Sequence, residues 1–215
     1  MTSSSISQKI DALCASNPIV PVIVVNKAEE ILPLARALKE GGITVLEITL
    51  RSDAAIEAIA LARKELEGVT VGAGTVINAQ QLDAVMEAGA EFVVTPGASV
   101  KLLKDAKARN TVLLPGIASV SEIINGLDEG YDRFKFFPAE AAGGLPFIKS
   151  LQGPFSQVRF CPTGGIGLKN YQEYLKQPNI MAVGGSWVVP TDAVESGDWA
   201  RITQITRETM QTLKG

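Results

Sequence analysis

The sequence alternates eight times between a short run of β-branched and apolar residues and a longer stretch with helical spacing. The short runs end at Gly, Pro, Ser or Thr, and about a dozen residues follow each of them. This alternation is typical of consecutive βα units, which build a parallel sheet. We therefore predict eight strands, at residues 19–25, 44–50, 70–75, 91–95, 111–114, 133–137, 157–161 and 180–183.

Helices are predicted between these strands, because apolar residues recur at helical spacing and several stretches end at glycine, which favours the end of a helix. Residues 27–42, 78–90, 168–177 and 198–215 are such stretches. The spacing of Ile6, Ile10 and Leu13 predicts a further helix within residues 1–17, ahead of the first strand. We expect that segment to be part of the mature protein rather than a signal peptide.

Eight βα units predict a single α/β domain over residues 1–215, folded as a (β/α)8 (TIM) barrel with an extra N-terminal helix. A chain of 215 residues lies near the lower limit for such a barrel. The alternative is a doubly wound open sheet, which the lack of a GxGxxG motif after the first strand weakens. In a barrel, the reactive groups lie at the C-terminal ends of the strands.

The second strand has two different faces. Leu46, Ile48 and Leu50 share one face, while Glu47 and Arg51 belong to the other. Because successive strand residues point in opposite directions, the apolar face packs on the helices and the polar face is turned inward. A guanidinium group can bind a carboxylate through two hydrogen bonds, so Arg51 is a candidate ligand for an anionic substrate.

The sixth strand places a lysine on its inner face. Phe134 and Phe136 face the helices, which turns Lys135 and Phe137 inward, where Lys135 can meet Glu47 across the lumen. Burial beside phenylalanine favours the neutral, nucleophilic form of an amine, which imine formation requires. A carboxylate could exchange the protons of that chemistry. The alternative interpretation, a structural ion pair, stays open at this point.

Composition restricts the chemistry. The chain has no histidine, which removes the commonest general base, the usual zinc ligand and every Ser-His triad. Cys14 and Cys161 lack CxxC spacing, so we expect two reduced thiols and no metal. The net charge of −3, with scattered basic residues, predicts neither a nucleic-acid nor a membrane partner. A cytoplasmic protein that binds a small molecule is expected.

Glycine pairs follow the last two predicted strands. Thr163 precedes Gly164 and Gly165, and Gly184 and Gly185 precede a serine, Ser186. In barrel enzymes, the loops after strands seven and eight commonly bind phosphate through backbone N–H groups. Two glycine pairs at these two loops therefore predict a phosphate site, to which Ser186 would add a hydroxyl donor. Thr163 and Thr75, at strand ends, are candidate donors to the substrate.

The motifs VPVIVV, LEITLR, VGAGTV, TPG, PGI, FKFFPAE, FCPTGG and GGSW occur in this order and closely resemble the bacterial 2-keto-3-deoxy-6-phosphogluconate (KDPG) aldolase family. The resemblance covers nearly the whole chain. It implies a Schiff-base (class I) aldolase that needs no cofactor. The implied reaction cleaves KDPG to pyruvate and glyceraldehyde 3-phosphate, the last step of the Entner–Doudoroff pathway. A second implied reaction cleaves 4-hydroxy-2-oxoglutarate (KHG) to pyruvate and glyoxylate.

The resemblance also implies a homotrimer and a role for each motif residue. Lys135 would form the imine and Glu47 would act as acid and base. The implied contacts to the substrate are Arg51 and Thr75 at the carboxylate, Pro96 and Phe137 as pocket walls, and Thr163, Gly164, Gly165, Gly184, Gly185 and Ser186 toward the phosphate end. The rival hypotheses are a phosphate-binding barrel isomerase or synthase, a metal-dependent aldolase, and a non-catalytic sensor of sugar-acid phosphates.

Overall fold

The computed structural model describes residues 3–213, an α/β fold in which every strand pair is parallel. The helices predicted within residues 1–17 and 198–215 include positions 1–2 and 214–215, which lie outside the described residues. One sheet has the order β5-β4-β3-β2-β1-β9 and the other the order β6-β7-β8. The strands are β1 Ile19–Ile23, β2 Val45–Thr49, β3 Thr70–Gly74, β4 Phe92–Val94, β5 Leu113–Leu114, β6 Gly116–Ile117, β7 Arg133–Phe136, β8 Arg159–Pro162 and β9 Val183–Gly185.

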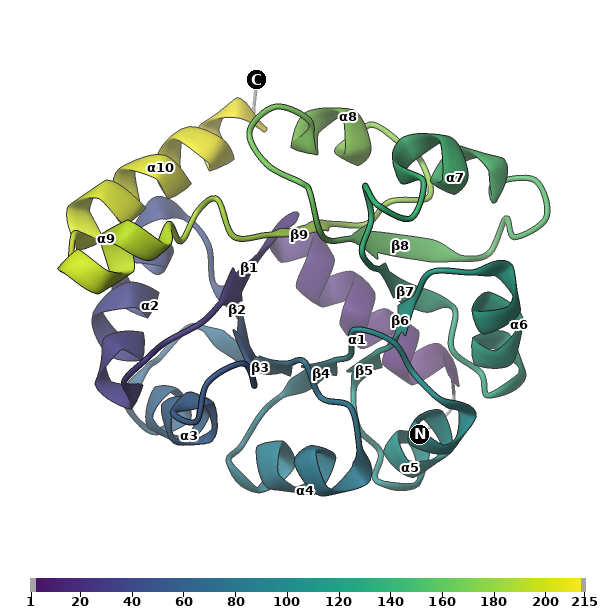
Figure 1. Ribbon diagram of the computed structural model, residues 1–215, viewed down its shortest axis with the longest axis horizontal. Coiled ribbons are helices and arrows are strands. Elements are labelled where there is room, and N and C mark those ends of the chain that lie inside the picture. Colours follow the sequence, from purple (N-terminus) through teal and green to yellow (C-terminus); the bar gives the residue numbers. More distant parts are fainter. Residues whose placement is uncertain (1–2, 214–215) are drawn as a thin grey trace.

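Helices follow the strands along the chain and lie outside them, whereas α1 crosses behind the centre of the view (Figure 1). The helices are α1 Ser3–Ser16, η1 Ala28–Glu30, α2 Ile31–Gly41, α3 Ala55–Glu65, α4 Ala79–Glu87, α5 Val100–Ala108, α6 Val120–Asp128, α7 Gly144–Ser150, α8 Tyr171–Leu175, α9 Thr191–Ser196 and α10 Trp199–Thr212. Side-chain caps define several of their starts. Asn78, Ser99 and Ser119 each accept a hydrogen bond from an N–H group in the first turn of the helix that follows.

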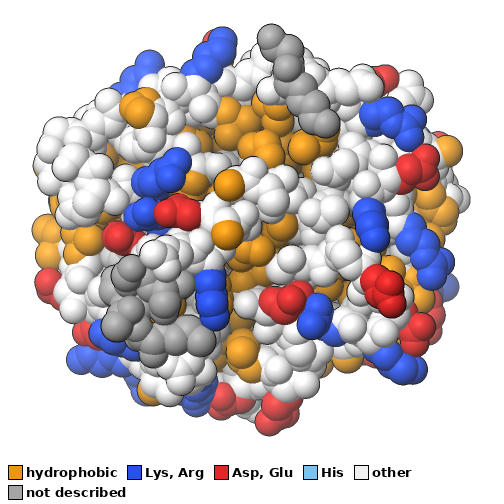
Figure 2. Space-filling model, turned by 180° about the vertical axis from the view of Figure 1, so that it is seen from behind, with side chains coloured by type: hydrophobic (Ala, Val, Ile, Leu, Met, Phe, Trp, Pro, Cys, Tyr) orange, Lys and Arg blue, Asp and Glu red, His pale blue; other side chains and the backbone are white. Residues whose placement is uncertain are grey.

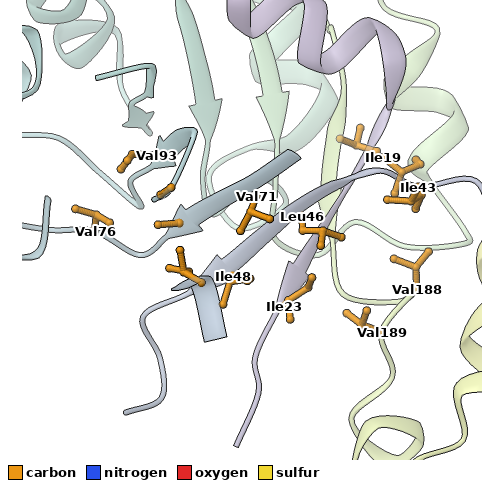
Figure 3. Packing of buried hydrophobic residues seen from close by; sticks show 14 of the residues in the cluster. Ile19, Ile23, Ile43, Leu46, Ile48, Val71, Val76, Val93, Val188 and Val189 are labelled. Atoms are coloured by element: carbon orange, nitrogen blue, oxygen red, sulfur yellow. The ribbon is translucent and has the colours of Figure 1, made fainter. Parts of the chain in front are cut away.

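Two apolar clusters lie on opposite faces of the strands. The larger one packs between strands and helices and contains Leu46 and Ile48, both fully buried (Figure 3). The smaller one lies on the inner face and contains Val45 and Cys161. The alternation predicted for the second strand is therefore confirmed, and so is that of the sixth, because Phe134 and Phe136 belong to the larger cluster. Val158 and Phe160, at β8, belong to it as well.

Helix α1 covers one end of the inner cluster. Its side chains Ile6, Ile10 and Cys14 are buried there against residues of the strands. Asp11, on the same helix, accepts two hydrogen bonds of 2.8 Å from the guanidinium group of Arg133. The predicted helix is confirmed over the described residues, and its buried face packs on the inner cluster, on the side opposite the C-terminal ends of the strands.

Two strand predictions were wrong in detail. The fifth strand, predicted as 111–114, is split into β5 and β6 at Pro115, which has no N–H group to donate to a neighbouring strand. The eighth, predicted as 180–183, is β9, which starts at Val183 and includes both glycines of its motif. Isolated bridges from Phe160 to Ile180 and from Thr163 to Gly184 connect β8 with this segment.

The surface seen from behind carries basic and acidic side chains interspersed with one another, around apolar side chains near its centre (Figure 2). No strongly basic area gathers on this face, as the scattered charges of the sequence predict. Among residues 3–213, no helix has the length and apolar content needed to cross a membrane.

Candidate active site

Lys135 and Glu47 form a buried pair at the centre of the fold. The Nζ atom of Lys135, on β7, lies 3.1 Å from Oε1 of Glu47, on β2. The two residues are 5% and 2% exposed, so neither charge has bulk water beside it. The ring of Phe137 approaches the pair, with Lys135 Nζ 5.4 Å from its centroid. The predicted meeting of lysine and carboxylate across the lumen is confirmed as geometry.

Glycine makes room for the carboxylate. A Cβ atom on Gly74, in β3, would lie 2.4 Å from Glu47 Oε1, so any larger residue there would displace the carboxylate. The sequence analysis did not select this residue. Its signal is the VGAGTV motif, where Gly72 and Gly74 stand two residues apart and therefore on one face of the strand.

A cavity of about 20 Å³, room for roughly one water molecule, adjoins the pair. Glu47, Lys135 and Thr163 supply most of its polar lining, and apolar side chains of α1 and the strands complete it. Cys14 and Cys161 also line this cavity, and both are free and buried. Burial raises the pKa of Cys14 to about 12 and that of Cys161 well above its usual value. Both thiols therefore stay protonated, and neither competes with Lys135 as a nucleophile.

Thr75 and Pro96 follow β3 and β4 at the same end of the fold. Thr75 has a φ of 63°, the left-handed region that a β-branched residue rarely adopts. Such strain persists where the surrounding structure enforces it, most often at functional sites. The backbone of Pro96 packs so closely against Gly116 that a Cβ atom there would lie 2.4 Å from the Pro96 carbonyl group.

The loop after β8 has the conformation expected of an anion-binding segment. Gly164 and Gly165 have φ angles of 99° and 76°, which favour glycine. Within residues 3–213, the N–H groups of Gly165 and Ile166 donate to no protein acceptor, while that of Gly164 faces β9 in the bridge between Thr163 and Gly184. The carbonyl oxygens of Thr163, Gly164 and Gly165 each accept a hydrogen bond. The helix that follows begins only at Tyr171, so the amide groups of the loop are the donors nearest the strand end.

The second glycine pair lies inside β9. A Cβ atom on Gly184 would lie 2.2 Å from the Thr163 hydroxyl oxygen, so the absence of a side chain lets β8 and β9 approach. The ring of Trp187 covers Gly185, and a Cβ atom on Gly185 would lie 1.9 Å from Cζ3 of that ring. Ser186 follows at the surface and is exposed.

Arg51 lies outside the cavity that holds the Lys135–Glu47 pair. Its side chain is exposed and, with Ser186, lines a cleft of about 280 Å³ beyond the ends of β1 and β2. Strand alternation does not place Arg51, because β2 ends at Thr49. Polar residues that the sequence analysis missed line the same cleft, namely Asn26, Thr191 and Glu195. Of these three residues, only Asn26 could have been selected from the sequence, because it is the polar residue directly after the first predicted strand.

No group of three or more acidic or cysteine side chains that could hold a metal ion occurs among residues 3–213. Arg133 and Arg159 form ion pairs with Asp11, at 2.8 and 3.6 Å, on the side of the fold that α1 covers, which is a structural role.

A parallel α/β fold with a buried lysine–carboxylate pair at its centre is an arrangement suited to an enzyme that works through an imine. The model of the KDPG and KHG aldolase family matches residues 10–205. The "KHG/KDPG aldolase" of Escherichia coli K12 is 50% identical over 204 residues, 95% of this chain and 96% of that protein. The "2-dehydro-3-deoxy-phosphogluconate aldolase" of Dickeya dadantii is 52% identical over 198 residues, 92% of this chain and 93% of that protein.

Solved structures agree. The KDPG aldolase of Legionella pneumophila, with pyruvate captured at low pH as a covalent carbinolamine intermediate, superposes with a TM-score of 0.90 at 49% identity, covering 92% of this chain and 96% of that one. The enzyme of Zymomonas mobilis, solved with 3-phosphoglycerate, gives a TM-score of 0.88 at 49% identity and covers 94% of both chains. The protein described here is an aldolase, a carbon–carbon lyase, and belongs to the KDPG and KHG aldolase family.

Proposed function

We propose that this protein is a Schiff-base aldolase that cleaves KDPG to pyruvate and glyceraldehyde 3-phosphate, and KHG to pyruvate and glyoxylate. One observation carries the assignment of the chemistry, namely the buried contact of 3.1 Å between Lys135 Nζ and Glu47 Oε1. The names of the relatives and the pyruvate carbinolamine of the Legionella enzyme support the reaction class.

Imine formation requires a proton to leave Lys135, and Glu47 accepts it. The neutral amine attacks the C2 ketone of the substrate, and the resulting carbinolamine loses water to give a protonated imine. Glu47 passes protons during these steps, with the cavity beside the pair offering room for a water molecule.

The protonated imine then withdraws electrons from the C3–C4 bond. The C4 hydroxyl group gives up its proton to Glu47, the C3–C4 bond breaks, and the aldehyde leaves while the pyruvyl fragment becomes an enamine. Glu47 returns a proton to C3, and water hydrolyses the imine to free pyruvate and Lys135. No metal ion or organic cofactor takes part in these steps.

The rest of the substrate contacts the loops at the strand ends. Thr75 and Arg51 bind the carboxylate, for which the long, exposed side chain of Arg51 turns toward Lys135. Phe137 and Pro96 form pocket walls, and the Thr163 hydroxyl group binds a substrate hydroxyl. The phosphate is bound by amide groups of Gly164, Gly165, Gly184 and Gly185 and by the Ser186 hydroxyl group.

We propose that the two sheets close into one (β/α)8 barrel over residues 1–215, with β5 and β6 as halves of one strand and α1 as an extra helix. The bridges from Phe160 to Ile180 and from Thr163 to Gly184 support this closure. A homotrimer in the cytoplasm is part of the same proposal. The two buried, free cysteines fit a reducing compartment.

Borohydride trapping tests the proposal. Pyruvate followed by sodium borohydride reduces the imine, so we expect loss of activity and the added mass of the reduced pyruvyl group on the peptide that contains Lys135. The Lys135→Met variant gains no mass and loses turnover. Lys149→Met, which removes an exposed lysine of the neighbouring helix α7, traps pyruvate like the wild type.

Two results would overturn the proposal. One is trapped pyruvate on another lysine with Lys135 unmodified, which would move the chemistry elsewhere. The other is activity that EDTA removes and a divalent cation restores, which would make the enzyme a metal-dependent aldolase.

A further inference from the structure

The loop proposed to bind phosphate is held in place by the segment that follows β7. The Ala139 N–H group donates to Thr163 O at 2.8 Å, and the Glu140 N–H group donates to Gly164 O at 3.1 Å. These bonds continue the β7–β8 ladder beyond the strands and occupy the carbonyl oxygens of the loop. The N–H groups of Gly165 and Ile166 are left for a ligand, and their direction depends on this neighbouring segment.

The side chain of Glu140 packs over the loop. A Cβ atom on Gly165 would lie 2.6 Å from Cγ of Glu140, and the oxygen Oε1 of Glu140 is 3.2 Å from the corresponding position on Gly144. Glu140 itself is exposed. An exposed carboxylate samples many rotamers unless a partner restrains it, so its position over Gly165 requires such a partner.

Tyr174 of α8 is that partner. Its hydroxyl group donates a short hydrogen bond to Oε1 of Glu140, and the residue is 1% exposed. Burial raises the pKa of Tyr174 above its usual value, and the bond to Glu140 raises it further. The phenol is therefore protonated at neutral pH and able to donate. Figure 1 shows α7 and α8, which follow β7 and β8 in the chain, lying next to each other on the outside of these strands.

We propose that Tyr174 and Glu140 are positioning residues that fix the Gly164–Gly165 loop for the phosphate group of the substrate and so set the preference for phosphorylated over unphosphorylated keto acids. This rests on the proposed function, because it assumes that the loop binds phosphate. The buried tyrosine restrains the carboxylate, the carboxylate packs on Gly165, and the loop amides keep one direction.

The two proposed substrates form an internal control, because KDPG has a phosphate group and KHG has none. In Tyr174→Phe we expect KM for KDPG to rise about tenfold, the effect of losing one charge-assisted restraint on binding, with kcat little changed. We expect kcat/KM for KHG to stay within about twofold of the wild type. Inorganic phosphate, titrated by calorimetry, should bind the variant about tenfold more weakly.

Tyr171→Phe is the matched control. Tyr171 lies on the same helix and is 3% exposed, but its hydroxyl group is directed to the Thr209 carbonyl, 3.5 Å away, and not to the loop. Its removal should leave both substrates and phosphate binding unchanged. Equal losses for KDPG and KHG in Tyr174→Phe would indicate a general structural defect and would overturn the proposal, as would no loss for either substrate.

Glu140→Gln keeps the test valid if Tyr174→Phe does not fold. The glutamine oxygen still accepts from Tyr174, so KM for KDPG should be no higher than in the wild type. A KM for KDPG raised about tenfold in Glu140→Gln would overturn the positioning role. Failure of the proposed function is a different result, namely that the wild-type protein cleaves neither substrate. Even then, the calorimetric comparison of phosphate binding needs no turnover and decides whether Tyr174 and Glu140 position the loop.

Discussion

Thr75 adopts a backbone conformation that costs free energy, about 1–3 kcal/mol for a residue in a sparsely populated region. Its φ of 63° would suit glycine. We expect Thr75→Gly to raise Tm by about 2–4 °C, because relief of strain outweighs the added entropy of the unfolded chain. The lost hydroxyl donor should lower kcat/KM about tenfold. Calorimetry and pyruvate detection measure the two effects.

Asn110→Gly is the control for this prediction. Asn110 also has a positive φ, 55°, but it lines a groove beside α1 at the opposite end of the fold from Thr75. Its substitution should leave kcat/KM unchanged. Unaltered kcat/KM in Thr75→Gly as well would exclude Thr75 from substrate binding.

The Lys135–Glu47 pair was predictable because strand alternation is a local rule that holds for every residue inside a strand. The two residues are 88 positions apart in sequence, and they still meet. The same rule was applied to Arg51 as well, but it does not hold there, since Arg51 lies beyond the end of β2. The sequence analysis did not select Gly74, because a glycine adds no side chain to the alternation along a strand. The contact that explains it, with Glu47, is tertiary.

At the scale of elements, the sequence predicted the order of strands and helices but shifted β9. Glycine weakens an isolated strand, so the glycine pair indicated a loop. In the fold, β9 needs both glycines, because Thr163 and Trp187 occupy the space where their side chains would be. Close approach between strands that are distant in sequence has no local signal. The glycine motif was correctly interpreted as important, but its packing role was not foreseen.

Gly184→Ala should therefore disturb β8 and β9 together. The new methyl group would lie 2.2 Å from the Thr163 hydroxyl oxygen and displace that side chain. We expect a loss of about 1–3 kcal/mol from overpacking, a decrease in Tm of roughly 2–12 °C, together with lower kcat. Thermal unfolding and steady-state kinetics measure both.

Gly167→Ala is the comparison within the same region. A Cβ atom there meets nothing within 4 Å, so Tm and kcat should stay close to the wild type. Similar losses in the two variants would mean that any side chain in this region is harmful, and the specific contact between Gly184 and Thr163 would not explain the effect.

For the whole molecule, the position of α1 was the least predictable feature. Its apolar spacing indicated that one face is buried, but periodicity does not say against what. The contacts that answer this are Ile10 and Cys14 in the inner cluster and Asp11 between Arg133 and Arg159. Asp11 supplies the acidic partner of both arginines, and the sequence analysis did not identify it.

The docking of α1 should depend on pH through Asp11. The hydrogen bond from Arg133 lowers the pKa of this carboxyl group, so its stabilising effect is complete above the unfolded pKa of about 4 and is lost as pH falls through the lower folded value. We expect Asp11→Asn to lower Tm by about 2–4 °C at pH 7, equivalent to about 1 kcal/mol after solvent screening of a partly exposed pair. The difference should disappear toward pH 2. Asp192→Asn, which breaks the exposed pair with Arg201, should change Tm little at any pH. A wild-type advantage over Asp11→Asn that persists at the lowest pH would show that the ion pair with Arg133 is not its cause.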